Sequence, residues 1–240
     1  MPGLTNSPRS LDDVALGLAP LEGRVAVVSG AGDELGGATA MLLARLGASV
    51  GVIDVDAARA NAVASEAAAA GAESVALVAD VSEEDDVEWA AAELEQRFGR
   101  CDALVNNTVA AVVTPLEDLD PAEWDRAMAV SLRGAFLCMR AFGGMMLAGE
   151  GGTVVNVASA AATGPAPLAA VASTGGAGRL MLSRLGAVEW GSRGVRVNAI
   201  RVGQVADPVE VAAVIAFLSG EGSSYITGES FEVDKEVRSG

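Results

Sequence analysis

Short apolar runs typical of β-strands alternate along the chain with longer segments of helical periodicity. The strand-like runs are continuously apolar rather than alternating, which is typical of strands buried on both faces. They cover residues 24–30, 49–56, 74–81, 102–107, 153–159, 195–200 and 230–234. The helix-like segments cover residues 38–47, 58–71, 82–99, 121–147, 172–190 and 207–220. Strict alternation predicts a parallel sheet with helices on both faces, a three-layer α/β/α sandwich of the doubly wound, Rossmann type.

The length of the chain, 240 residues, fits one domain of this kind. Hydrophobic residues make up 51% of the chain and charged residues 20%, a balance typical of a globular protein. Residues 1–20 precede the first strand-like run, and we expect them to form a flexible N-terminal arm. The predicted domain therefore covers residues 21–240.

Composition also excludes several kinds of function. The formal net charge of −16 argues against nucleic acid and anionic membranes as partners. The chain has no histidine, which excludes histidine-based catalysis and most zinc or haem sites, so we expect no metal. No uninterrupted apolar run reaches the about 18 residues that cross a bilayer, and no signal pattern is evident, so we expect a cytoplasmic protein. Cys101 and Cys138 lie in apolar patterns and are predicted to be unpaired core thiols.

A glycine-rich turn follows the first strand-like run. The segment SGAGDELGG (29–37) leads into a helix, as turns that cradle a pyrophosphate do. Asp54 ends the second run at a spacing from Gly30 that suits a carboxylate accepting hydrogen bonds from an adenosine ribose, which favours NAD over NADP. Because parallel sheets bind ligands at the carboxyl ends of their strands, this edge is the predicted nucleotide site.

Several motifs in order resemble those of the short-chain dehydrogenase/reductase family, over roughly residues 21–236. LEGRVAVVSG resembles the family's first strand, DALVNN its fourth strand with two asparagines, and GTVVNVAS the strand that carries its catalytic serine. GVRVNAI and SSYITGESFEVD resemble its late strands. The resemblance implies the Rossmann fold and NAD(P)-dependent oxidoreductase ancestry. It also implies cofactor contacts from Gly30, Gly32, Leu35, Gly36, Asp54, Asp80, Val81 and Asn107.

The family's catalytic groups are mostly missing from the matching positions. The resemblance places Val171 at the position of the proton-transferring tyrosine and Gly175 at that of the lysine four residues later. Ser131 stands at the position of the supporting asparagine, and only the serine remains, as Ser159. Valine can neither donate nor accept a proton, and glycine brings no charge. The resemblance therefore implies a degenerate member that lacks the Tyr-x-x-x-Lys pair.

Two other residues cannot replace that pair. The only tyrosine, Tyr225, falls in the family's structural YITG motif, and the only lysine, Lys235, lies near the C-terminus. Ser159 itself has two interpretations, a substrate-orienting hydroxyl or a polar residue that caps a turn at a strand end.

The matching cofactor positions also depart from the family. Glu34 stands at the middle glycine of the turn, where its side chain would obstruct and repel a pyrophosphate. A second register, Gly30-x-Gly32-x-x-x-Gly36, keeps a usable turn, so NAD binding stays open. Thr108 and Val109 stand where the family has small residues next to another part of the cofactor. The segment that covers the substrate in the family, after the sixth strand, is missing from this sequence.

Three functions remain open. The first is a non-catalytic subunit that pairs with an active NAD-dependent oxidoreductase subunit, or with itself, through helices 121–147 and 172–190. In the family these helices form a four-helix interface, and here they stay apolar with small residues that permit close approach. The second is an active NAD(H)-dependent alcohol or ketone oxidoreductase with displaced catalytic groups. The third is a nucleotide-binding or structural module.

Overall fold

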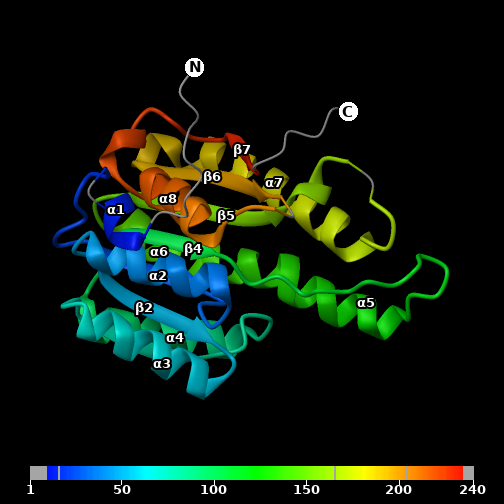
Figure 1. Ribbon diagram of the computed structural model, residues 1–240, viewed down its shortest axis with the longest axis horizontal. Helices are drawn as coiled ribbons and strands as arrows, with labels where there is room; N and C mark the ends of the chain where they lie inside the picture. The colour runs from blue at the N-terminus through cyan, green and yellow to red at the C-terminus, as the bar shows by residue number, and fades with distance from the viewer. Residues whose placement is uncertain (1–9, 16, 165, 204, 235–240) are drawn as a thin grey trace.

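A seven-stranded parallel sheet forms the centre of the protein in the computed structural model, which describes residues 10–15, 17–164, 166–203 and 205–234 (Figure 1). The strands are β1 (Val25–Ser29), β2 (Ser49–Asp54), β3 (Ser74–Val78), β4 (Ala103–Asn106), β5 (Gly152–Ser159), β6 (Val195–Val202) and β7 (Ser230–Val233). Their order is β3-β2-β1-β4-β5-β6-β7, and every neighbouring pair is parallel. The strand order reverses between β1 and β4, as in a doubly wound sheet. The predicted fold class is confirmed.

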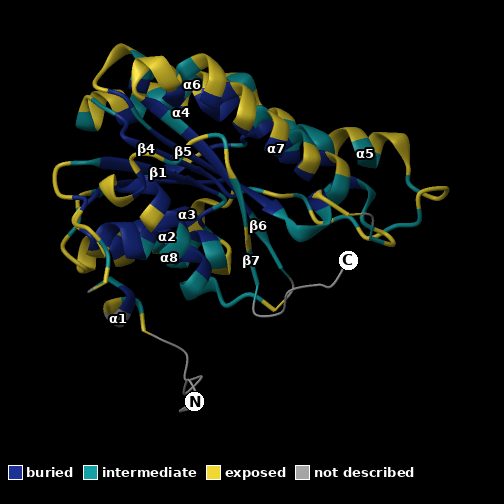
Figure 2. Cartoon of the chain, turned by 90° about the horizontal axis from the view of Figure 1, so that it is seen from above, coloured by how far each residue is buried: buried dark blue, intermediate teal, exposed yellow. Residues whose placement is uncertain are grey.

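Helices cover both faces of this sheet, and the strands between them are the most buried part of the molecule (Figure 2). One face carries α2 (Glu34–Arg45), α3 (Ala57–Ala69) and α8 (Pro208–Ser219). The other carries α4 (Glu84–Phe98), α6 (Gly134–Ala148) and α7 (Ala170–Trp190). Each face has its own large hydrophobic cluster, because strands buried on both faces present apolar side chains to both helix layers. Turns of 3₁₀-helix lie at Ala160–Ala162, Gly191–Arg193 and Glu221–Ser223.

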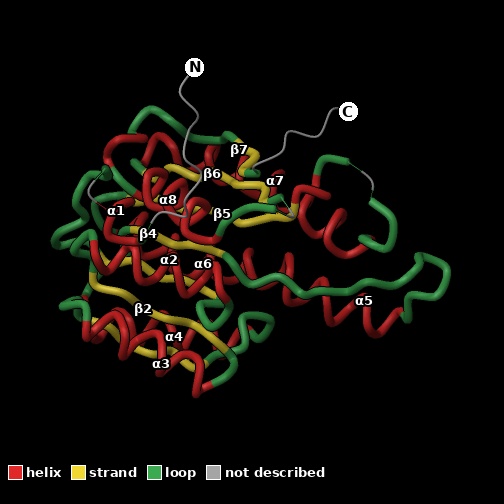
Figure 3. The backbone as a smooth tube through the Cα atoms, viewed as in Figure 1, coloured by secondary structure: helices red, strands yellow, loops and turns green. Residues whose placement is uncertain are grey.

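The helix predicted over 121–147 is interrupted. α5 (Pro121–Met128) passes into α6 through a π-helical turn at Ala129–Arg133. The loop between β4 and α5 extends away from the sheet (Figure 3), and Val113 in this loop is 76% exposed. Among the described residues, Pro121–Ala148 is the stretch long and apolar enough to cross a bilayer by length and composition, with mean hydropathy 1.2. Half of its most apolar window is buried within the fold, as in the core helix of a folded domain.

Part of the segment expected to be a flexible arm is packed against the domain. Leu11–Ala15 form the short helix α1, which contacts α2 and α8. Val14 is buried, and Leu11 and Ala15 lie on the same helix face and pack on the same cluster, as does Leu18 beyond the end of the helix. Residues 1–9 and 16 lie outside the described residues.

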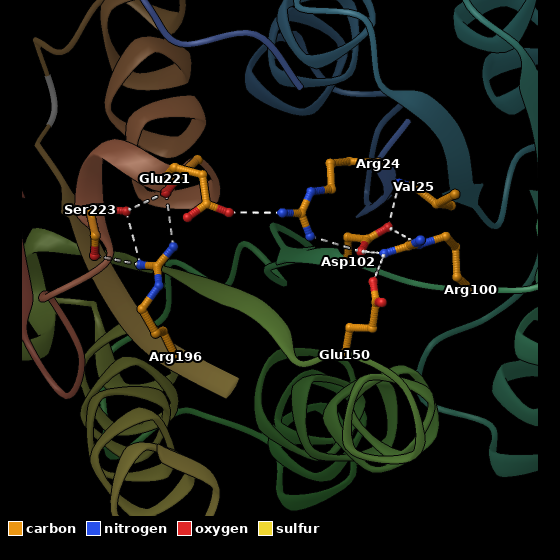
Figure 4. Close-up of polar contacts among 9 residues, drawn as sticks. Arg24, Val25, Arg100, Asp102, Glu150, Arg196, Glu221 and Ser223 are labelled. Carbon is orange, nitrogen blue, oxygen red and sulfur yellow. Dashed lines mark hydrogen bonds and ion pairs between the residues drawn. The ribbon is translucent and has the colours of Figure 1, made fainter. Parts of the chain in front are cut away.

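An ionic network joins the amino-terminal ends of β1 and β4, at the edge of the sheet opposite the glycine-rich turn (Figure 4). The buried carboxylate of Asp102 accepts hydrogen bonds from the Val25 N–H at 2.8 Å, from Arg100 Nε at 2.8 Å and from Arg24 Nη1 at 3.3 Å. Arg24 also donates to Glu221 at 2.8 Å, which ties the start of β1 to the turn after α8. These charges satisfy one another, so the network stabilises the sheet.

Both cysteines are buried and free, as predicted. Burial raises the pKa of the Cys138 thiol to about 12 and raises that of Cys101 further still. Both thiols therefore stay protonated at neutral pH and are poor nucleophiles. In the described ranges, no group of three or more His, Cys, Asp or Glu side chains is placed to hold a metal ion.

Candidate functional site

The carboxyl ends of four strands bring together the residues that the sequence singles out. Gly30 follows β1, Asp54 ends β2, Asn107 follows β4 and Ser159 ends β5. Because these strands are parallel neighbours, all four residues lie along one edge of the sheet. Two cavities open at this edge. One, of about 130 Å³, lies beside Asp54, and the other, of about 400 Å³, lies beside Ser159.

A carboxylate of the chain itself sits on the N-terminus of α2. Asp33 is the N-cap residue, and its Oδ1 accepts a hydrogen bond from the Gly36 N–H at 2.6 Å. Asn107 Nδ2 donates to both carboxylate oxygens of Asp33, at 3.1 and 3.0 Å, and to the Gly30 carbonyl at 3.0 Å. Gly30 has a φ of 64°, which favours glycine at this turn. The end of the helix that attracts anions therefore already contacts one.

The carboxylate that caps the N-terminus of α2 belongs to Asp33 and not to its neighbour Glu34, although both residues are exposed. Glu34, expected to obstruct the turn, is exposed at the first position of α2. The signal for Asp33 was available, because an aspartate directly before a helix is a common N-cap. It was missed because the helix was predicted to start at residue 38, four residues late.

The two acids expected to contact adenosine are both hydrogen-bonded within the chain. Asp54 is buried, and its two oxygens accept from the N–H groups of Gly32 and Asp56, each at 2.9 Å. Asp80 Oδ1 accepts from the Ser82 N–H at 2.9 Å and from its hydroxyl at 2.7 Å. A Cβ atom added to Gly32 would lie 2.6 Å from Asp54 Oδ2, so glycine is needed for this contact.

The remaining expected cofactor residues surround these acids. Val81 is buried and lines the smaller cavity with Asp54 and Asp80, whereas Leu35 packs on the core cluster of the α2 face. Thr108 also lines this cavity and lies directly against the glycine-rich turn. A Cβ atom added to Gly30 would lie 2.9 Å from Thr108 Oγ1 and 3.0 Å from its Cα.

Helix α7 presents apolar or absent side chains near this edge. Val171 is fully buried, and Gly175 is packed so closely that an added Cβ atom would lie 3.3 Å from Ser131 Cβ. Ser131 lies in the π-helical turn, where its hydroxyl accepts a hydrogen bond from the Ala110 N–H at 2.9 Å. These contacts bring α7, the π-helical turn and the loop after β4 together.

Ser159 lies where β5 meets the larger cavity. Its Oγ accepts a hydrogen bond from the Ala161 N–H at 3.2 Å and so caps the following 3₁₀ turn. Among the described residues that line this cavity, Ser159 has the one polar side chain, and the others include Val109, Ala172 and Val202. A serine hydroxyl needs a neighbouring base to become reactive, and the lining described here offers none.

Arg179 is the main residue of this region that sequence analysis missed. It lies one helical turn beyond Gly175 in α7 and is 1% exposed. Its guanidinium donates to four backbone carbonyl groups, those of Asn106, Thr108, Ser131 and Val157. Burial lowers the pKa of Arg179 to about 10, so it remains a cation at neutral pH. This buried charge is balanced by carbonyl dipoles and joins β4, β5 and the π-helical turn.

Comparison with known proteins gives concordant matches over most of the chain. The sequence profile of the short chain dehydrogenase family matches residues 24–214. D-threitol dehydrogenase of Mycolicibacterium smegmatis is 32% identical, over 89% of this chain and 92% of its own. The (2S)-[(R)-hydroxy(phenyl)methyl]succinyl-CoA dehydrogenase subunit BbsD of Thauera aromatica is 30% identical, over 87% of this chain and 94% of its own. The structure of NAD⁺-bound xylitol dehydrogenase superposes with a TM-score of 0.84 at 26% identity, covering 88% of this chain and 97% of that one.

Proposed function

The chain belongs to the short-chain dehydrogenase family, and from this premise we propose that it is a non-catalytic subunit that pairs with an active NAD-dependent member of the family. One observation carries the proposal. The cavity beside Ser159 is lined, in the described part of the chain, by apolar side chains and that single hydroxyl. An alcohol or ketone placed there would meet, among the described lining residues, no titratable side chain with which to exchange a proton.

The expected loss of rate is large. In this proposal Val171 and Gly175 replace the family's catalytic tyrosine and lysine. Loss of a positioned general acid or base costs about 10²- to 10⁴-fold in rate. Loss of the accompanying electrostatic stabilisation costs about 10²- to 10³-fold more, if it compares with an oxyanion donor. Arg179 does not replace the lysine, because its guanidinium is committed to backbone carbonyls.

Exposed apolar side chains support a role in pairing. Met181, Leu185 and Val188 lie on one face of α7 and are all exposed, Val188 at 83%. Phe136 of α6 is also exposed and lines a shallow groove of about 450 Å³ with Met128 and Leu132. Exposed apolar patches of this kind mark interfaces between proteins. One relative is itself named as a dehydrogenase subunit, which is consistent with a role in an assembly.

Co-expression tests the pairing. The tagged chain should co-purify with an intact homologue that carries the Tyr-x-x-x-Lys pattern, and light scattering should give the mass of a mixed oligomer. The double variant Leu185→Glu/Val188→Glu should weaken this complex by at least about tenfold, because both side chains leave water on pairing. Val55→Glu is the matched control, since Val55 is exposed after β2, away from α7, and should leave the complex unchanged.

The outcome that contradicts the proposal is equally specific. If the chain forms only assemblies with itself, or stays monomeric, in the presence of intact homologues, it is not a subunit of a mixed oxidoreductase.

A further inference from the structure

Two N–H donors of the glycine-rich turn, those of Gly32 and Gly36, are occupied by carboxylates of the same chain. In a doubly wound sheet the turn after the first strand and the N-terminus of its helix cradle a pyrophosphate. Here the Gly36 N–H donates to Asp33 at 2.6 Å, and the Gly32 N–H donates to Asp54 at 2.9 Å. The amide of Asn107 donates to the same Asp33 carboxylate. A phosphate oxygen arriving at this turn would have to displace an aspartate from each of these donors.

The charge of Asp33 and the size of the adjacent cavity also disfavour a pyrophosphate at this turn. The Asp33 carboxylate lies on the N-terminus of the 12-residue helix α2, so a pyrophosphate there would meet a like charge at contact distance. The cavity beside Gly30, Asp54 and Thr108 measures about 130 Å³, whereas ligand pockets usually measure about 300–1,000 Å³. The charge of Asp33 and the small volume of this cavity therefore both disfavour a pyrophosphate at the turn, and the cavity of about 400 Å³ beside Ser159 is not lined by residues of the turn.

We propose that Asp33 is a built-in anion that takes the place of the pyrophosphate and excludes dinucleotides from this chain. The aspartate satisfies the helix N-terminus and the Asn107 amide as a bound phosphate would, so the turn keeps its shape with no ligand present. This inference goes beyond the proposed function, because a chain without an acid–base pair can still bind a cofactor. Binding of NADH without turnover would overturn it and leave the proposed function intact.

Calorimetry with NADH on the full chain tests the proposal. The variant Asp33→Ser removes the charge but keeps a residue that caps helices well, so α2 should remain folded. Asp33→Asn, also a good cap, is a second variant in case the first does not fold. Glu34→Gln is the matched control, since it removes one negative charge from the adjacent exposed residue.

The proposal predicts different effects on NADH binding for substitutions at Asp33 and at Glu34. The unaltered chain and Glu34→Gln should give no measurable heat of binding, and both Asp33 variants should bind NADH at least about tenfold more tightly than either. Micromolar binding of NADH by the unaltered chain would overturn the proposal. So would folded Asp33→Ser and Asp33→Asn proteins that bind no better than Glu34→Gln.

Discussion

Replacing Arg179 with alanine is expected to lower the free energy of unfolding by about 3 kcal/mol or more. The substitution removes every side-chain donor from four backbone carbonyl groups and leaves a space in the core between α7 and the sheet. Each buried acceptor left without a partner costs about 1–3 kcal/mol, and the cavity adds to this. For a chain of this length the midpoint of thermal unfolding should fall by about 6–12 °C.

Urea denaturation followed by circular dichroism measures this effect. Arg184→Ala is the control, because Arg184 is exposed on the same helix and its loss should change stability by no more than about 0.5 kcal/mol. If Arg179→Ala were as stable as Arg184→Ala, the guanidinium would not be what joins α7 to β4, β5 and the π-helical turn.

In a complex with an active homologue, Ser159→Ala in this chain should leave turnover within about twofold of the unaltered complex. The serine hydroxyl caps the turn at Ala161 and has no base beside it in the described cavity lining, so we expect it to contribute nothing to proton transfer. Substitution of phenylalanine for the homologue's catalytic tyrosine should instead reduce turnover by about 10²- to 10⁴-fold. The measurement is the initial rate of NADH formation by each of the two variant complexes, after the presence of both subunits in each complex has been verified.

The opposite pattern would place the chemistry in this chain. A loss of about 10²-fold or more on Ser159→Ala, with the complex intact, would mean that the hydroxyl acts on substrate and that a second group in this chain serves it.

The architecture could be predicted because it depends on patterns repeated along the whole chain. Continuous apolar runs alternating with helical segments require parallel strands, and parallel strands place Gly30, Asp54, Asn107 and Ser159 at one edge whatever the details of packing. The boundaries of the helices were harder to predict from the sequence. The start of α2 depends on one capping contact of Asp33, and its signal is weak among glycines.

Features that depend on distant contacts could not be predicted. The π-helical turn around Ser131 interrupts a segment whose periodicity predicts one continuous helix. At this turn the Ser131 carbonyl accepts a hydrogen bond from Arg179, which belongs to another helix, α7. A single arginine in a helix is usually exposed. Only the packing of β4 and β5 beneath α7 shows that Arg179 is buried among carbonyl groups.

The most direct measurement is the turnover rate of the purified chain alone. It is measured as reduction of NAD⁺ with a panel of alcohols, including D-threitol and xylitol, and as oxidation of NADH with the matching ketones. Ordinary enzymes turn over about 10 times per second, and loss of both acid–base and electrostatic groups should reduce this at least about 10⁴-fold. We therefore expect fewer than about 10⁻³ turnovers per second for every compound. A kcat of about 1 per second or more for any of them, abolished by Ser159→Ala, would contradict a non-catalytic chain.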